Sequence, residues 1–219
     1  MPCRPTTRIS IRKNPEHSRS DVASPLFDNR GRPFDHEPVN PAPRKIHRLA
    51  APWLAIPLVV TLSTGIAYRT GMAWFGMGKK AGGWLLDIHA GGWLGDTGSV
   101  IYVILNGAGL LGLIATGLYL VLKSRTKGQP RIVHRILGAV FLLPLATSAI
   151  TGIAFKIGDE WLHLPDSTLG LLMSIHQGSW LGKTARPFYV LAIGIGLLGL
   201  AISGLQMAGV FRKKKRDIA

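Results

Sequence analysis

The residues of this chain that are best suited to bind a metal or a cofactor are its histidines. There are seven histidines and only one cysteine. When the sequence is shifted by 87 residues it matches itself without a gap, at about 30 of the 81 positions from 44 to 124. This shift places His47 on His134 and His89 on His176. These four residues are therefore the candidate site. The histidines without a histidine partner are His17, His36 and His163.

The elements that must position these histidines are long apolar blocks. The mean hydropathy is +0.25, and 17% of the residues are charged, which is below the roughly 25% usual for soluble domains. Four blocks exceed the about 20 residues needed to cross a bilayer, and each must be helical to satisfy its own backbone in lipid. The predicted fold is an all-α membrane protein, a four-transmembrane-helix bundle. The blocks are 47–68, 99–122, 134–155 and 187–211.

Positive charge is distributed unevenly among the segments between these blocks. Twenty of the 26 lysines and arginines lie in the N-terminal segment, in the loop near 123–135 and at the C-terminus. The positive-inside rule therefore predicts that both termini are cytoplasmic. Topology then accounts for the net charge of +15, and a nucleic-acid binder is disfavoured. The lone Cys3 disfavours a secreted disulfide scaffold.

The internal match divides the chain into two transmembrane hairpin repeats, 44–125 and 131–212. Each hairpin would leave the cytoplasmic side and return to it, so the copies are predicted to be parallel repeats about an axis along the membrane normal. Residues 1–43 are rich in Pro, Arg, Ser and Asp and are predicted to be a disordered or loosely docked tail. Residues 213–219 form a basic C-terminal tail.

This topology determines which histidines can meet. His47 and His134 lie where the first and third blocks begin, on the predicted inner side, whereas His89 and His176 precede the second and fourth blocks on the outer side. The two histidines of one repeat would be separated by roughly 30 Å of hydrocarbon. The axis instead brings each histidine opposite its repeat mate, which predicts one inner and one outer site.

Two opposed imidazoles inside a helical bundle are typical of a six-coordinate haem iron. A zinc site would require four ligands, and the carboxylates near the histidines do not repeat, since Asp87 falls on Ser174 and Asp96 on Lys183. There is no C-x-x-C-H motif for covalent haem attachment. Two non-covalent b-type haems are the cofactors expected. The alternative is that these histidines are polar anchors at the membrane interface.

Several neighbours of the histidines fit a haem site and also have plainer explanations. Arg48 and Arg135 follow the inner histidines and could pair with haem propionates, or they are positive-inside flanks. Trp93 and Trp180 follow the outer histidines by four residues, on the same face if that stretch is helical, or they belong to an interfacial aromatic belt.

Small residues near the histidines also recur in both repeats. Gly91 and Gly178 would let a flat macrocycle approach the backbone, or they are turn glycines. A further set has the spacing of a close helix contact in a membrane, and pure packing is the interpretation we favour for it. This set is Gly109, Gly112 and Thr116 with their repeat mates Gly196, Gly199 and Ser203.

The order and spacing of these motifs over about residues 44–212 resemble the PepSY-associated transmembrane helix family. The family includes inner-membrane haem b proteins that pass electrons across the membrane, among them ferric-siderophore reductases. The resemblance implies that the four paired histidines are axial haem ligands. The outer loops, about 69–98 and 156–186, are too short to contain a PepSY domain. The motifs are His47-Arg48 to Thr64-Gly65, Ile88-His89 to Thr97-Gly98, Gly109 to Gly117-Leu118, and, in the second repeat, His134-Arg135, Ile175-His176 and Leu181 to Thr184.

The sequence thus favours a di-haem b-type membrane cytochrome that transfers electrons from a cytoplasmic-side donor to an outer acceptor, such as ferric iron or a ferric chelate. As an enzyme it would be a transmembrane oxidoreductase of the bacterial inner membrane, or of a specialised internal membrane. The alternative is a non-enzymatic accessory or assembly subunit of a larger membrane complex. A transporter is disfavoured because no carboxylate or lysine lies inside an apolar block.

Overall fold

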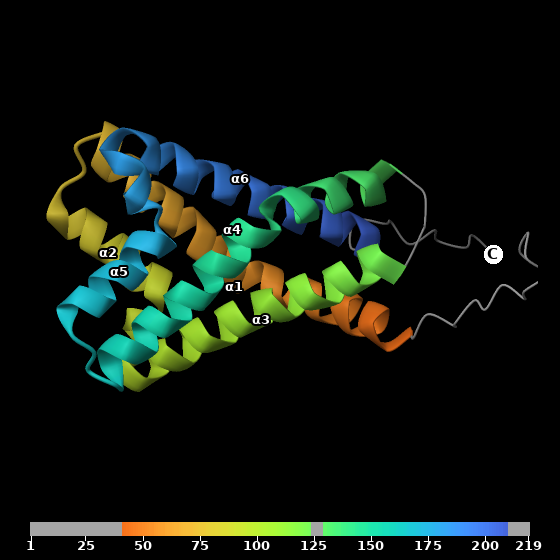
Figure 1. Ribbon diagram of the computed structural model, residues 1–219, viewed down its shortest axis with the longest axis horizontal. Helices are drawn as coiled ribbons and strands as arrows, with labels where there is room; N and C mark the ends of the chain where they lie inside the picture. Colours follow the sequence, from red (N-terminus) through yellow and green to blue (C-terminus); the bar gives the residue numbers. More distant parts are fainter. Residues whose placement is uncertain (1–40, 124–128, 210–219) are drawn as a thin grey trace, which may run out of the picture. The chain divides into compact units, whose positions relative to one another are not determined.

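The computed structural model describes residues 41–123 and 129–209, and these residues are helical apart from short turns. The predicted tails, 1–43 and 213–219, lie outside the described residues, except that 41–43 already belong to the first helix. The described part forms a helical bundle, as the apolar blocks predict (Figure 1).

Four helices of the bundle are long and apolar enough to cross a membrane. Between 11% and 17% of the residues in their most apolar windows are buried inside the bundle, so most of this apolar surface faces outward, as lipid requires. Each helix begins before its predicted block because the polar residues that precede the block continue the helical backbone, and the last helix ends at Ala208, before the predicted end at 211. These helices are α1 (Pro41–Trp74), α3 (Gly95–Lys123), α4 (Gln129–Glu160) and α6 (Gly182–Ala208).

Two further helices occupy the segments that the hydropathy pattern assigns to loops. The helix α2 (Lys79–Ala90) is followed by the short 3-10 helix η1 (Gly92–Leu94), and α5 (Asp166–His176) is followed by η2 (Ser179–Leu181). A search for membrane-spanning lengths passes over helices of about three turns, which is why these two were not predicted. Both carry a paired histidine at or next to their last residue.

The long helices are arranged so that each packs against two others. The helices α1 and α4 both contact α3 and α6, which leaves α1 and α4 diagonally opposite each other. The helix α2 packs mainly on α1, and α5 packs on α4. Figure 1 shows α2 and α5 at the end of the bundle remote from the start of α1 and the end of α6. One histidine pair is therefore expected at each end.

Glycines allow close contact between α3 or α6 and the neighbouring helices. A Cβ atom on Gly109 would lie 2.5 Å from Leu54, and one on Gly196 would lie 2.6 Å from the ring of Phe141. Gly112 differs from them, because nothing lies within 4 Å of its Cβ position. The predicted packing face is thus confirmed at Gly109 and Gly196 and is wrong at Gly112, which is exposed on the outward side of α3.

Replacing Gly196 with Leu is expected to destabilise the detergent-solubilised bundle by about 1–3 kcal/mol, because the added side chain overlaps the Phe141 ring. The matched variant Gly112→Leu makes the same chemical change where there is space and should leave stability nearly unchanged. Thermal unfolding followed by circular dichroism would compare the two variants. Equal losses of stability would contradict this account of the packing.

Candidate functional site

The two predicted histidine pairs are present in the bundle. The rings of His47 on α1 and His134 on α4 face each other with their centroids 6.3 Å apart. The rings of His89 on α2 and His176 on α5 face each other at 6.4 Å. The interplanar angles are 82° and 75°, so each pair is nearly perpendicular. The structure thus brings together the residues that the 87-residue shift pairs.

This separation matches the space that a metal ion between two imidazoles requires. An imidazole nitrogen binds a first-row metal at about 2 Å, and the ring centre lies about 1.1 Å further away, so two opposed rings would have centroids about 6.3 Å apart. The observed values are 6.3 and 6.4 Å. Over the described residues there is no group of three or more His, Cys, Asp and Glu side chains suited to a metal. Each pair can therefore supply two ligands, and a cofactor would have to supply the others.

Hydrogen bonds determine which nitrogen of His47 and His134 carries the proton. The Nδ1 atom of His47 lies 2.8 Å from Thr116 Oγ1, and that of His134 lies 2.9 Å from Ser203 Oγ. Both hydroxyls already donate their single proton to a backbone carbonyl four residues earlier, at 2.7 Å. Each hydroxyl must therefore accept from Nδ1–H. The Nε2 atoms are left as lone-pair donors.

His89 and His176 also carry a proton on Nδ1, because the acceptors of their hydrogen bonds are backbone carbonyls. His89 Nδ1 lies 2.7 Å from the carbonyl oxygen of Thr61, and His176 Nδ1 lies 2.9 Å from that of Ser148. A carbonyl oxygen can only accept, so both rings donate from Nδ1. Within residues 41–123 and 129–209, no hydrogen bond engages Nε2 of any of the four paired histidines. Metal-binding histidines characteristically donate their other ring N–H in this way.

A glycine of an adjacent helix lies against each histidine ring. A Cβ atom on Gly65 would lie 2.9 Å from His89 Cε1, and one on Gly152 would lie 3.0 Å from His176 Cε1. Gly117 and Gly204 approach the other pair at 3.5 Å. These glycines follow a threonine or serine in all four cases, so the repeated T-G and S-G motifs provide the close contacts for the rings.

Each histidine pair lines its own cavity. The cavity at His47 and His134 has a volume of about 500 Å³, and the cavity at His89 and His176 has one of about 450 Å³. Both volumes lie in the range of cofactor sites, about 300–1,000 Å³. Four leucines line both cavities and so form a single layer of side chains between them. This leucine layer consists of Leu58, Leu110, Leu145 and Leu197, which are two pairs offset by 87 residues.

The two sites are closer to each other than the sequence predicts. His89 reaches into the bundle and bonds to Thr61, which is 14 residues after His47 on the same helix. At the rise of an α-helix this places the pairs about 21 Å apart along the axis, not roughly 30 Å. The difference arises because α2 and α5 pack against α1 and α4 and bring His89 and His176 to carbonyls within those helices.

The electrostatics of the His89–His176 site favour neutral rings. Burial and, to a smaller extent, the neighbouring His176 lower the pKa of His89 to about 4, and the hydrogen bond to Thr61 partly opposes both effects. Burial also lowers the pKa of His176. Both rings are therefore neutral at physiological pH, which is the protonation state of a metal-binding imidazole.

The other predicted site residues are placed differently. Arg135 lines the cavity at His134, whereas Arg48 is exposed and lines neither cavity. Trp93 and Trp180 line neither cavity and are 66% and 65% exposed. The two tryptophans do not share a helical face with the histidines because a left-handed glycine, Gly91 or Gly178, ends the helix between them.

Gly91 and Gly178 are turn glycines. Their φ angles are 69° and 68°, in the left-handed region that favours glycine. A Cβ atom at these positions would lie 2.7 Å from Tyr102 and 2.3 Å from Tyr189, respectively. Of the two interpretations that the sequence left open, the structure supports the turn.

Several polar residues of the site were not predicted as such. Thr116 and Ser203 were assigned to helix packing, and Thr61 and Ser148 were not singled out. Their common signal is that a hydroxyl residue recurs at the same distance from the histidine in each repeat, 69 residues after it for Thr116 and Ser203. Asn106 was also missed; its amide donates to Thr61 Oγ1 at 3.2 Å.

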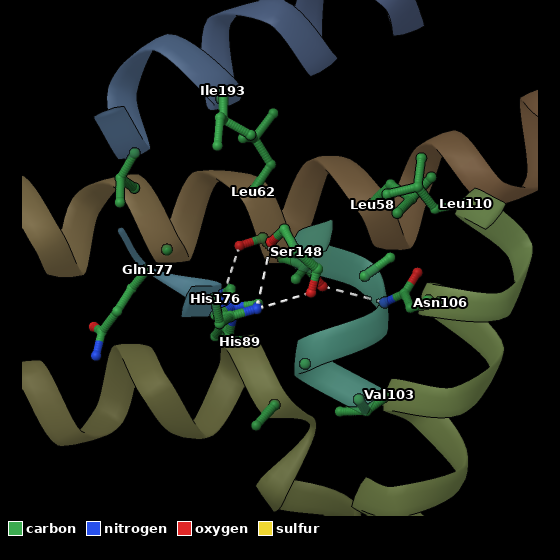
Figure 2. Close-up of a pocket in the computed structure, with 18 of the residues that line it drawn as sticks. Leu58, Leu62, His89, Val103, Asn106, Leu110, Ser148, His176, Gln177 and Ile193 are labelled. Carbon is green, nitrogen blue, oxygen red and sulfur yellow. Dashed lines mark hydrogen bonds between the residues drawn. The ribbon is translucent and has the colours of Figure 1, made fainter. Parts of the chain in front are cut away.

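Asn106 distinguishes the His89–His176 cavity from its counterpart. The residue is 7% exposed, and its Oδ1 atom is buried without a hydrogen-bond partner. Figure 2 shows Asn106 on the side of the histidine pair nearer to Leu58 and Leu110, opposite to Gln177 (Figure 2). The equivalent residue of the second repeat is Ile193, so this polar group is present on one side of the cavity only.

Comparison of the chain with family models, with curated protein sequences and with solved structures finds no match.

In the ligand-free protein, the free energy of unfolding is expected to decrease as the pH falls from 6.5 toward 4, by roughly 3 kcal/mol from His89 alone. The folded-state pKa lies below the unfolded value, so protonation favours the unfolded chain. Denaturation at a series of pH values would show this decrease in the wild type and a smaller one in His89→Gln. Identical profiles would contradict the buried, neutral ring.

Proposed function

We propose that this protein is a di-haem b-type membrane cytochrome that transfers electrons across a membrane. In this proposal His47 and His134 hold the inner haem, and His89 and His176 hold the outer haem. The observation that carries the proposal is that both pairs present two imidazole rings at a spacing suited to a shared metal ion.

The chain's own residues provide what axial ligation requires. Thr116 and Ser203 accept from Nδ1 in one site, and the carbonyls of Thr61 and Ser148 do so in the other, which leaves Nε2 as the nitrogen that could bind a metal. Such outer partners fix the orientation of the ring and raise its basicity. A haem iron would supply reversible one-electron chemistry, with a potential set by its ligands and its burial.

The leucine layer supports transfer between the two sites. Its four side chains separate the cavities and line both of them, so there is no intervening helix or loop. The two histidine pairs are about 21 Å apart along the axis of the bundle. A macrocycle held by each pair would occupy part of this distance, so the gap between the two macrocycles would be shorter than about 21 Å. The layer also consists of apolar side chains alone, so it excludes water from the midpoint of the bundle.

The orientation and location are also proposals. The charge distribution supports cytoplasmic termini, and in that orientation the two hairpins would be parallel repeats with the His89–His176 site toward the outside. The resemblance to the PepSY-associated transmembrane helix family supports a bacterial inner membrane and an outer acceptor such as ferric iron or a ferric chelate. The acceptor would have to bind without a PepSY domain, because the outer loops are too short to contain one.

The cofactor can be tested by purification in mild detergent, followed by oxidised and dithionite-reduced spectra with a haem-to-protein ratio. About two b-type haems per chain are expected in the wild type and about one in each of His47→Ala and His89→Ala, with a different haem lost in each variant. His163→Asn is the control, because His163 is exposed and lines neither cavity. Asparagine also tolerates its left-handed backbone.

A folded wild-type preparation without haem would overturn the proposal. The four histidines would then be structural polar groups. A partner protein that co-purifies in a fixed ratio would in that case support the accessory-subunit alternative.

The proposed orientation predicts the accessibility of cysteines to a membrane-impermeant maleimide. In intact spheroplasts Cys3 should remain unlabelled until the membrane is permeabilised, because the N-terminus is cytoplasmic in this orientation. A Lys79→Cys variant in a Cys3→Ser background should be labelled without permeabilisation, since Lys79 begins α2 at the outer end. The reverse pattern would show that the protein is oriented the other way.

A further inference from the structure

Two arginines lie at the outer end of the His89–His176 site. Arg69 of α1 lines that cavity. Arg186 of α6 precedes Tyr189 and Val190, which line the cavity, by three and four residues, so it lies on the same face of the helix. The equivalent position in the first repeat is Ser99, which is 1% exposed. This position therefore faces into the bundle, and the second repeat places a cation there.

Neither guanidinium has a carboxylate partner in the described part of the chain. Arg69 donates from Nη2 to the side-chain oxygen of Gln177, a neutral group. The Nε atom of Arg186 is buried and has no hydrogen-bond partner. The two arginines also repel each other electrostatically.

The third cation at this cavity has a different environment. Lys156 is the repeat equivalent of Arg69 and also lines the cavity, but its ammonium group is paired with Glu160 at 2.8 Å. The pseudo-symmetric cavity thus has one neutralised cation on one side and two arginines without a carboxylate on the other. Partly buried guanidinium groups are normally paired with an anionic group. The positive charge of Arg69 and Arg186 is not neutralised in this way, so an anionic ligand group could bind there.

We propose that Arg69 and Arg186 form a carboxylate-binding site and that they bind the propionate-bearing edge of the haem held by His89 and His176. This inference rests on the proposed function. Two guanidiniums are complementary to two carboxylates, because each presents a planar fork of N–H donors. Gln177 positions Arg69 and directly follows His176, so one short segment would orient both the ring and the carboxylate partner.

The inference assigns a direction to the outer haem. Its carboxylates would point toward the outer end of the bundle, and its apolar edge would point toward Asn106 and the leucine layer. Neither arginine was predicted from the sequence, where Arg48 and Arg135 at the inner site were the candidates for this role.

The test uses the full-length chain with His47→Ala and His134→Ala, so that only the outer pair remains. This protein is titrated with ferric haem b and with its dimethyl ester, in which both carboxylates are blocked, and binding is followed by the Soret band. Haem is expected to bind about 10- to 100-fold more tightly than the ester, because charge-assisted hydrogen bonds are lost in the ester. Arg69→Gln combined with Arg186→Gln should remove this preference. Lys183→Gln, at an exposed cation that does not line the cavity, should retain it.

The outcomes separate this inference from the proposed function. If haem and its ester bind the arginine-containing protein equally well, the carboxylate site is wrong and the haem site stands. If the preference survives in the double glutamine variant, the assignment to these arginines is wrong. If neither compound binds, both proposals fail. The comparison of haem with its ester needs no arginine variant, so the test holds even if that variant does not fold.

Discussion

The arrangement of this site depends on the hydrogen bond that each paired histidine donates from Nδ1. An N–H group buried inside a helical bundle is costly without a hydrogen-bond acceptor, so a protein acceptor stabilises the buried imidazole. His47 and His134 use hydroxyls whose protons are already committed, and His89 and His176 use backbone carbonyls. Both solutions fix the same tautomer, and both hold the ring where its Nε2 can act as a ligand.

Two further features of the bundle allow the histidines to form this bond. A ring can reach an acceptor on the next helix only if the two backbones are close, and the glycines at 65, 117, 152 and 204 leave that space. The short helices α2 and α5 serve the same purpose, because they carry His89 and His176 down to carbonyls in the middle of α1 and α4. A carbonyl oxygen has two lone pairs, so those of Thr61 and Ser148 can accept from the ring without leaving their place in the helix.

The two cavities share this construction but differ in polarity. The cavity at His47 and His134 is lined by apolar side chains apart from these two histidines and Arg135. The cavity at His89 and His176 also contains Asn106, whose repeat equivalent is Ile193, and Arg69. A buried polar group with an unsatisfied oxygen is costly, and so are partly buried cations without carboxylates. The two cavities therefore offer a ligand different environments, and the difference lies in the polar groups around His89 and His176.

The sequence by itself determined the membrane-spanning helices and the pairing of the four histidines, because hydropathy and an ungapped repeat are both properties of residue order. It did not determine the short helices α2 and α5, since their length and mixed polarity are below what a search for spans detects. The tertiary structure alone decided the tautomers, the leucine layer and the position of Arg186 beside Arg69. The tautomers, the leucine layer and the arginine positions depend on which helices are neighbours. The neighbours are determined by tertiary packing, because α1 packs between α3 and α6 and this brings residues more than 60 positions apart into contact.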